Sequence, residues 1–167
     1  KAAKIFFSLP QETKLKIHDD NLGYYRGYIP IEGESTDPGT SGDLKEAFDL
    51  GLQLKINDPQ YPGYKRMSAP NLWPEDLPNF RSSIEAYFQA ALDLAKKLFR
   101  LFAVSLDMNE NYFDSITDMP IAQMRLIHYP PLESTDSNEK LGIGTHTDYE
   151  CFTLLLQDDT GGLELMN

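Results

Sequence analysis

The feature that most constrains this chain is a long apolar stripe between residues 82 and 106. That stripe has the spacing of one face of an α-helix with 3.6 residues per turn. Apolar side chains recur there at steps of three and four residues, namely Ile84, Tyr87, Phe88, Ala91, Leu92, Ala95, Leu98, Phe99 and Phe102. Such a stripe is typical of a face buried in a core, so we assign it a structural role and predict a helix over 82–106.

The chain before this helix predicts further helices and irregular loops. Residues 1–7 and 11–17 predict two short helices, because Leu9-Pro10 interrupts the helical pattern between them. Residues 21–78 are rich in Gly, Pro and Tyr, which predicts irregular loop with short strands, such as 23–29.

Beyond Pro120 the pattern changes to short β-prone segments, so helices come first and an antiparallel sheet second, an α+β arrangement. A short helix at 110–116, with Asn109 as its cap, leads into this region. Pro130-Pro131 closes the first predicted strand, because proline cannot donate to a strand ladder. The predicted strands cover 121–129, 151–157 and 163–166, and 142–146 is short and extended.

Length and charge limit the partners of this chain. It has 167 residues and a mass of 19.0 kDa, the size of one domain. It carries 15 basic and 26 acidic side chains, and its net charge of −11 disfavours nucleic acid and anionic membrane surfaces. No apolar run reaches the roughly 18 residues of a membrane helix. With Cys151 as the sole cysteine and no signal-peptide pattern, we expect a cytoplasmic protein without a disulfide framework.

The stretch that carries chemistry is Gly144-Thr145-His146-Thr147-Asp148. Residues two apart on a strand face the same way, so His146 and Asp148 can direct an imidazole and a carboxylate to one point. They are two of the three ligands in the 2-His-1-carboxylate group that holds non-haem Fe(II). A chain of this composition contains a His-x-Asp tripeptide by chance about 0.3 times. A surface histidine beside a solvated aspartate is therefore the alternative interpretation.

The context of this tripeptide resembles the iron(II)/2-oxoglutarate-dependent dioxygenases, in the branch that includes isopenicillin N synthase. The order and spacing of several segments match that family, and the match covers nearly the whole chain. The C-terminal segments are Met-Arg-Leu-Ile-His-Tyr-Pro-Pro at 124–131, His-Thr-Asp-Tyr at 146–149, Thr-Leu-Leu-Leu-Gln-Asp at 153–158 and Gly-Gly-Leu at 161–163. The N-terminal ones lie at 6–10, 23–24, 45–48, 71–74 and 77–81.

The resemblance implies a role for four of these residues. His146 and Asp148 match iron ligands, and Tyr129 matches a position that helps hold 2-oxoglutarate in several relatives. Arg125, on the same strand face as Tyr129, matches a basic residue that reaches a co-substrate or substrate carboxylate. The alternatives are a surface ion pair for Arg125 and core packing for Tyr129.

The resemblance also implies two residues of the substrate pocket. Leu155 matches a pocket-lining position near the metal, with a core leucine as its alternative. Glu46 lies in a segment that borders the pocket, where it could contact a cationic substrate group, although a solvated glutamate fits this position better. His128 points away from Tyr129 on a regular strand, so we do not expect it to bind metal.

As a whole, the resemblance implies an enzyme that oxidises a small organic molecule while decarboxylating 2-oxoglutarate to succinate. The cofactors would be Fe(II), 2-oxoglutarate and O2, with ascorbate as a reductant. The implied fold has an N-terminal region of helices and loops (1–119) packed on the first strands (120–167) of a double-stranded β-helix, or jelly roll, which is incomplete here.

The printed sequence has no counterpart of the family's second iron-binding histidine or its Arg-x-Ser element, so we expect a piece of a longer protein. Ile127 stands where many relatives carry asparagine. The alternatives are a truncated non-catalytic homologue and a hydrolase that binds zinc at the same two ligands.

Overall fold

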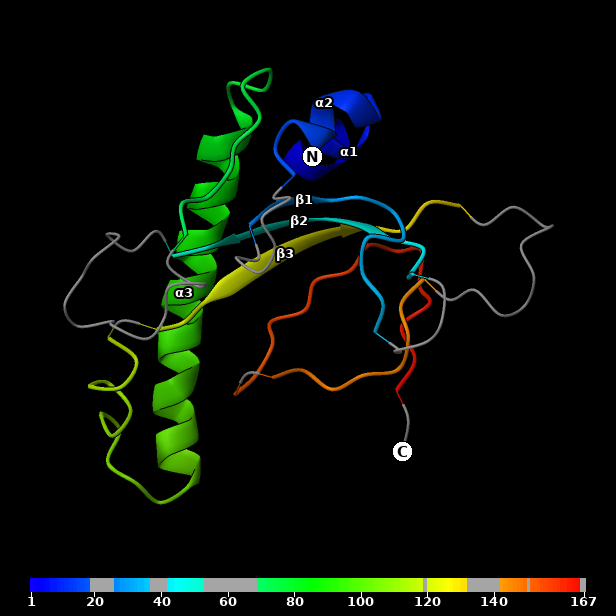
Figure 1. The fold of residues 1–167 in the computed structure, drawn as a ribbon. Coiled ribbons are helices and arrows are strands. Elements are labelled where there is room, and N and C mark those ends of the chain that lie inside the picture. Colours follow the sequence, from blue (N-terminus) through cyan, green and yellow to red (C-terminus); the bar gives the residue numbers. More distant parts are fainter. Residues whose placement is uncertain are drawn as a thin grey trace.

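The computed structural model describes residues 1–18, 26–36, 42–52, 69–118, 120–131, 142–149 and 151–165. Its helices and strands follow in the order α1 (Ala2–Phe7), α2 (Gln11–Leu15), β1 (Gly27–Ile29), β2 (Glu46–Gly51), α3 (Phe80–Ser105) and β3 (Gln123–His128). In Figure 1, α1 and α2 lie over one face of the sheet, and residues 142–149 and 151–165 lie on the other side. The sheet thus separates a helical layer, formed by α1 and α2, from the segment that carries His146 and Asp148.

The three strands form one antiparallel sheet in the order β1-β2-β3. Across the two strand pairs, Tyr28 faces Phe48 and Asp49 faces Arg125. Side chains alternate along a strand, so Phe48 and Leu50 point to the helical layer while Asp49 points to the opposite face. The central strand β2 therefore joins an apolar face and a charged face.

The core lies between the sheet, α1 and the first half of α3. Phe6 and Phe48 are fully buried, with ring centroids 5.2 Å apart, and Phe80 lies 5.0 Å and 5.1 Å from them. Such edge and stacked contacts add to the stabilisation from burial. The core residues are Phe6, Phe7, Ile17, Tyr28, Phe48, Leu50, Phe80, Ile84 and Phe88.

The long helix α3 confirms the predicted helix, beginning two residues earlier than expected, although Tyr87 and Phe102 of the apolar stripe are exposed. In its first half, Ile84 and Phe88 are buried in the core. In its second half, Phe99 and Phe102 contact Phe152, with ring centroids 5.1 Å and 5.2 Å apart. The stripe therefore packs on two different parts of the chain, the sheet and residues 151–165.

No helix among the residues placed by the structure is long and apolar enough to cross a membrane.

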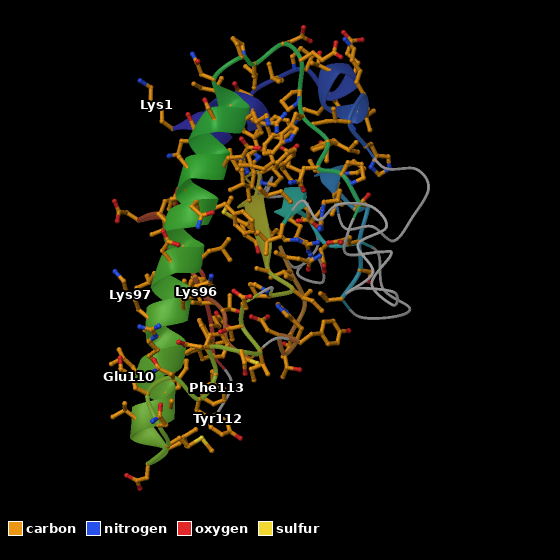
Figure 2. The ribbon with its side chains drawn as sticks, turned by 90° about the vertical axis from the view of Figure 1, so that its left-hand side faces the viewer. Lys1, Lys96, Lys97, Glu110, Tyr112 and Phe113 are labelled. Atoms are coloured by element: carbon orange, nitrogen blue, oxygen red, sulfur yellow. The ribbon has the colours of Figure 1, made fainter. Side chains whose placement is uncertain are left out.

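The chain turns after α3 without forming the helix predicted at 110–116, and that prediction is wrong. Asp107 adopts a left-handed φ of 56°, and the Met108 N–H donates to the Ala103 carbonyl at 2.9 Å, which caps α3. Consecutive turns follow, beside the C-terminal half of α3, where Figure 2 labels Tyr112 and Phe113. The backbone bonds here mostly span three residues, such as that from the Tyr112 N–H to the Asn109 carbonyl, whereas a regular α-helix needs bonds that span four.

Two strands, β1 and β2, form within the predicted loop at 21–78. The strand predicted at 23–29 is observed as β1 from Gly27, and residues 23–25 lie outside the described ranges. Strand β2 was not named among the expected strands. Its sequence Glu-Ala-Phe-Asp-Leu-Gly contains two acidic residues, which are depleted in strands. Both are buried because cations from distant parts of the chain pair with them. The strand is thus stabilised by contacts that its local sequence does not reveal.

The strands predicted at 151–157 and 163–166 are absent from the described residues 151–165, and residue 166 lies outside them. A strand needs a neighbouring backbone to complete its hydrogen-bond ladder. Leu155 and Leu156, which the pattern assigned to a strand, are exposed. The jelly roll therefore remains a prediction, whereas a mixture of helices with an antiparallel sheet is observed.

A buried charge cluster surrounds Glu46, so the prediction of a solvated glutamate is wrong. One carboxylate oxygen accepts from Lys14 Nζ at 2.6 Å and from the Tyr28 hydroxyl at 2.7 Å. The other accepts from His128 Nδ1 at 2.8 Å, while the His128 ring stacks on Phe7. Burial disfavours the charge of Glu46, but these three donors outweigh burial and lower its pKa below the usual range.

Substituting Phe48→Ala should lower the free energy of unfolding by about 3–5 kcal/mol, because it empties a fully buried site between three aromatic rings. Urea denaturation followed by circular dichroism measures the loss. Leu101→Ala, at an exposed position of α3, is the control and should change stability by no more than about 0.5 kcal/mol. Equal losses in both variants would contradict this core.

Substituting Glu46→Gln should cost about 3–5 kcal/mol, because it leaves Lys14 buried without its carboxylate. The folded-state pKa of Glu46 lies below the unfolded value of about 4.3, so the unfolded chain binds more protons between the two values. The stabilisation by Glu46 is therefore complete above the unfolded pKa and is lost as pH falls through the folded one.

Urea denaturation across this pH range should accordingly give the unsubstituted protein a steeper acid loss than Glu46→Gln. Glu85→Gln, which disrupts an exposed pair with Arg81 on α3, is the matched control and should keep the full acid slope. Parallel pH profiles for the unsubstituted protein and Glu46→Gln would refute the role of Glu46.

Candidate functional site

His146 and Asp148 face each other across a small gap. His146 Nε2 lies 3.5 Å from Asp148 Oδ1, and both side chains are about half exposed. They lie in the loop 142–149, which is irregular and not a regular strand. The predicted convergence of the imidazole and the carboxylate is therefore observed, although loop geometry and not strand alternation produces it.

The position of the His146 ring determines which ring nitrogen is available to bind a metal. Nδ1 lies 2.9 Å from the Gly144 carbonyl oxygen, which can only accept a hydrogen bond. Nδ1 must therefore carry the hydrogen, and in the neutral ring the lone pair is on Nε2, which faces Asp148. Metal-binding histidines commonly donate their second ring N–H in this way.

The carboxylate of Asp148 is oriented in a similar way. The Thr153 hydroxyl donates a short hydrogen bond to Asp148 Oδ2, which leaves Oδ1 directed toward His146. Two groups with lone pairs, each fixed through its other polar atom, thus face one position. This donor set fits Fe(II), which accepts imidazole nitrogen and carboxylate oxygen. Within the part of the chain that the structure describes, no third His, Cys, Asp or Glu joins them.

Arg125, which was predicted to contact a carboxylate of co-substrate or substrate, pairs with two carboxylates of the protein. Its Nε and Nη2 donate to Asp49 at 2.7 Å and 2.6 Å, and its Nη1 and Nη2 donate to Glu34 at 2.9 Å and 3.0 Å. Burial opposes the cation, but these two carboxylates outweigh burial and raise the pKa of Arg125. The geometry favours the ion-pair alternative. These bonds use four of the five N–H donors of Arg125, so a bidentate contact with a bound carboxylate would require it to release one of its partners.

Tyr129 follows β3 and lies against the loop that carries His146. A Cβ added to Gly142 would lie 2.8 Å from the Tyr129 ring, so any other residue there would force the ring to shift. Burial and the nearby charge of Asp43 raise the pKa of Tyr129, which keeps its hydroxyl protonated. The ring is half exposed, and it shares the strand face of Arg125, as predicted.

The two predicted pocket residues lie in different environments. Glu46 is enclosed by Lys14, Tyr28 and His128, so both of its oxygens already have partners. Leu155 is exposed on the segment after Thr153, and the core alternative does not describe it. His128 contacts Glu46 on the face opposite Tyr129, as strand alternation predicted.

The sequence did not identify four residues as part of this site. Thr153 was noted only as part of a family motif, and Gly144 only as a neighbour of His146. Thr36 and Asp43, which bind the Gly144 amide at 2.9 Å and 3.2 Å, lie more than 100 residues away in sequence. No local pattern marks such a contact, whereas a hydroxyl residue close after His-x-Asp could have been considered as a partner for the carboxylate.

Comparison with known proteins identifies the family to which both parts of this chain are similar. Residues 1–76 match the profile of the N-terminal region of non-haem dioxygenases, described for morphine synthesis, and residues 120–167 match that of the 2OG-Fe(II) oxygenase superfamily. The second match contains the loop with His146 and Asp148.

Individual relatives align over nearly the whole chain. A 2-oxoglutarate-Fe(II) type oxidoreductase of Emericella nidulans is 39% identical over 171 residues, which are 99% of this chain and 49% of the relative. A 2-oxoglutarate-dependent dioxygenase of Monascus ruber is also 39% identical, over 99% of this chain and 52% of its own. The chain thus spans about half the length of the curated relatives it matches.

A solved structure agrees with the fold as well. A full-length protein of Neurospora crassa, crystallised in complex with alpha-KG, has a TM-score of 0.70 and 30% identity, covering 89% of this chain and 46% of its own. The sequence profiles, the relatives and this structure identify the same group of proteins, and the chain belongs to the 2OG-Fe(II) oxygenase family.

Proposed function

We propose that this chain forms part of an Fe(II)/2-oxoglutarate-dependent oxygenase and supplies two of its three protein metal ligands, His146 and Asp148. The observation that carries the proposal is the pair of lone pairs, on Nε2 and Oδ1, that face each other at 3.5 Å. Gly144 and Thr153 occupy the other polar atom of each side chain, so both ligands are oriented in advance.

Around this pair, the chain's own residues would shape the site. Tyr129 presents a protonated hydroxyl from the strand face next to the loop, where it can donate to a carboxylate of 2-oxoglutarate. The Asp49–Arg125–Glu34 cluster holds that face in place. When bound, iron supplies the activation of O2 that couples decarboxylation of 2-oxoglutarate to oxidation of the substrate. Residues 120–167 would contribute the first strands of a double-stranded β-helix.

The proposed substrate is a small organic molecule. The structural neighbour from Neurospora crassa has also been solved with alpha-KG and thymine together. The net charge of −11 on this chain favours a neutral or cationic small molecule over a polyanion. Leu155, exposed two residues after Thr153, is positioned to contribute an apolar contact to such a substrate.

Replacing His146 or Asp148 by alanine should abolish both Mn(II) binding and succinate formation in the polypeptide that carries residues 1–167. We expect a loss of Mn(II) affinity greater than about 100-fold, because a ligand itself is removed. Isothermal titration with Mn(II) measures the affinity, and succinate is assayed with Fe(II), ascorbate and 2-oxoglutarate.

Asp159→Asn, at an exposed aspartate outside the site, is the control and should behave as the unsubstituted protein. Full turnover in His146→Ala would remove the ligand assignment. Activity with zinc that does not depend on 2-oxoglutarate would favour a hydrolase instead.

Substituting Thr153→Val should weaken Mn(II) binding by about 10–100-fold, because Asp148 Oδ2 loses its donor and the carboxylate is free to rotate. Thr153→Ser keeps the hydroxyl and should retain the unsubstituted affinity. Isothermal titration decides between them, and equal affinities in the valine and serine variants would contradict the orienting role of Thr153.

A further inference from the structure

The loop that carries His146 is tied to the N-terminal half of the chain through one backbone amide. The Gly144 N–H lies 2.9 Å from Thr36 Oγ1 and 3.2 Å from Asp43 Oδ1. The carbonyl of the same residue accepts from His146 Nδ1 at 2.9 Å. Gly144 thus contacts both the side chains of residues 36 and 43 and the imidazole ring.

The two side chains that hold Gly144 are themselves fixed. The Thr36 hydroxyl donates its single hydrogen to Asp43, so its oxygen is left to accept from Gly144. Lys45 Nζ, which is buried, donates to the other oxygen of Asp43 at 2.8 Å and lies 3.7 Å from Glu34. Because Glu34 also pairs with Arg125, the arrangement is anchored on β3.

The fit at Gly144 leaves no room for a side chain. A Cβ at this position would lie 2.5 Å from Thr36 Oγ1, closer than real Cβ contacts. The hydroxyl therefore lies directly against the backbone of residue 144, and neither partner can move toward the other without displacing it.

From this geometry we propose that Thr36 and Asp43 are positioning residues for His146, acting through Gly144. They fix the backbone of residue 144, so that its carbonyl holds the ring in the Nδ1–H form with Nε2 free for the metal. This inference rests on the proposed function for its consequence in metal binding. The selection of the ring tautomer, in contrast, can be measured without any metal.

The test compares Thr36→Val, which removes the hydroxyl at constant shape, with Thr36→Ser, which restores it. Nitrogen-15 chemical shifts of the His146 ring, recorded on the metal-free protein at roughly pH 8, report the tautomer. Mn(II) titration of the same proteins reports the affinity. Gly144→Ala displaces Thr36 from the other side and serves as a second variant.

Thr117→Val is the matched control, since its hydroxyl bonds the Phe113 carbonyl in the turns after α3. We expect Thr36→Val and Gly144→Ala to shift His146 toward the Nε2–H form and to weaken Mn(II) binding by about 10–100-fold. Thr36→Ser and Thr117→Val should keep the tautomer and affinity of the unsubstituted protein.

The inference is overturned if Thr36→Val and Gly144→Ala keep the original tautomer, or if Thr117→Val weakens Mn(II) binding as much as Thr36→Val. The dependence of Mn(II) binding on His146 tests the proposed function separately from this inference. If Mn(II) binding to the unsubstituted protein does not depend on His146, the metal site is wrong, while the tautomer measurement still decides whether Thr36 positions the ring.

Discussion

The antiparallel pairing of β2 with β3 is the contact that organises the other parts of this structure. It brings residues 46–51 beside residues 123–128, and it places Asp49 directly opposite Arg125. The guanidinium binds Asp49 and Glu34 in two forked arrangements, so each charge in this partly buried cluster has a partner. Removing one partner of such a cluster would leave a costly unpaired charge. The pairing thus fixes the strand that leads to Tyr129.

The two faces of this sheet differ in composition and in what they contact. On the helical side, aromatic rings from α1, β2 and α3 form the core, and the apolar face of β3 completes it. On the other side, charged residues form a polar layer that continues from Arg125 through Glu34, Lys45 and Asp43. The loop with His146 is attached to this layer at Gly144. The stability of the core and the orientation of the candidate metal ligands are therefore linked through one sheet.

Both candidate ligands are oriented by groups that do not themselves bind metal. The Gly144 carbonyl sets the ring of His146, and the Thr153 hydroxyl sets the carboxylate of Asp148. Such partners matter because a ligand that must reorient on binding loses affinity. The exposure of both side chains is compatible with this orientation, since each is fixed by a hydrogen bond and not by burial.

Local spacing along the chain was enough to predict several features. The 3.6-residue period indicated α3, the proline pair marked the end of β3, and the His-x-Asp spacing predicted that the imidazole and the carboxylate converge. The placement of β2, the burial of Glu46 and the attachment of Gly144 to Thr36 became visible only in three dimensions. These features depend on contacts between residues 18 to 108 positions apart, from Tyr28 with Glu46 to Thr36 with Gly144. Periodicity describes which face a residue takes within its own element, but a buried charge is stable only where the fold brings its partner.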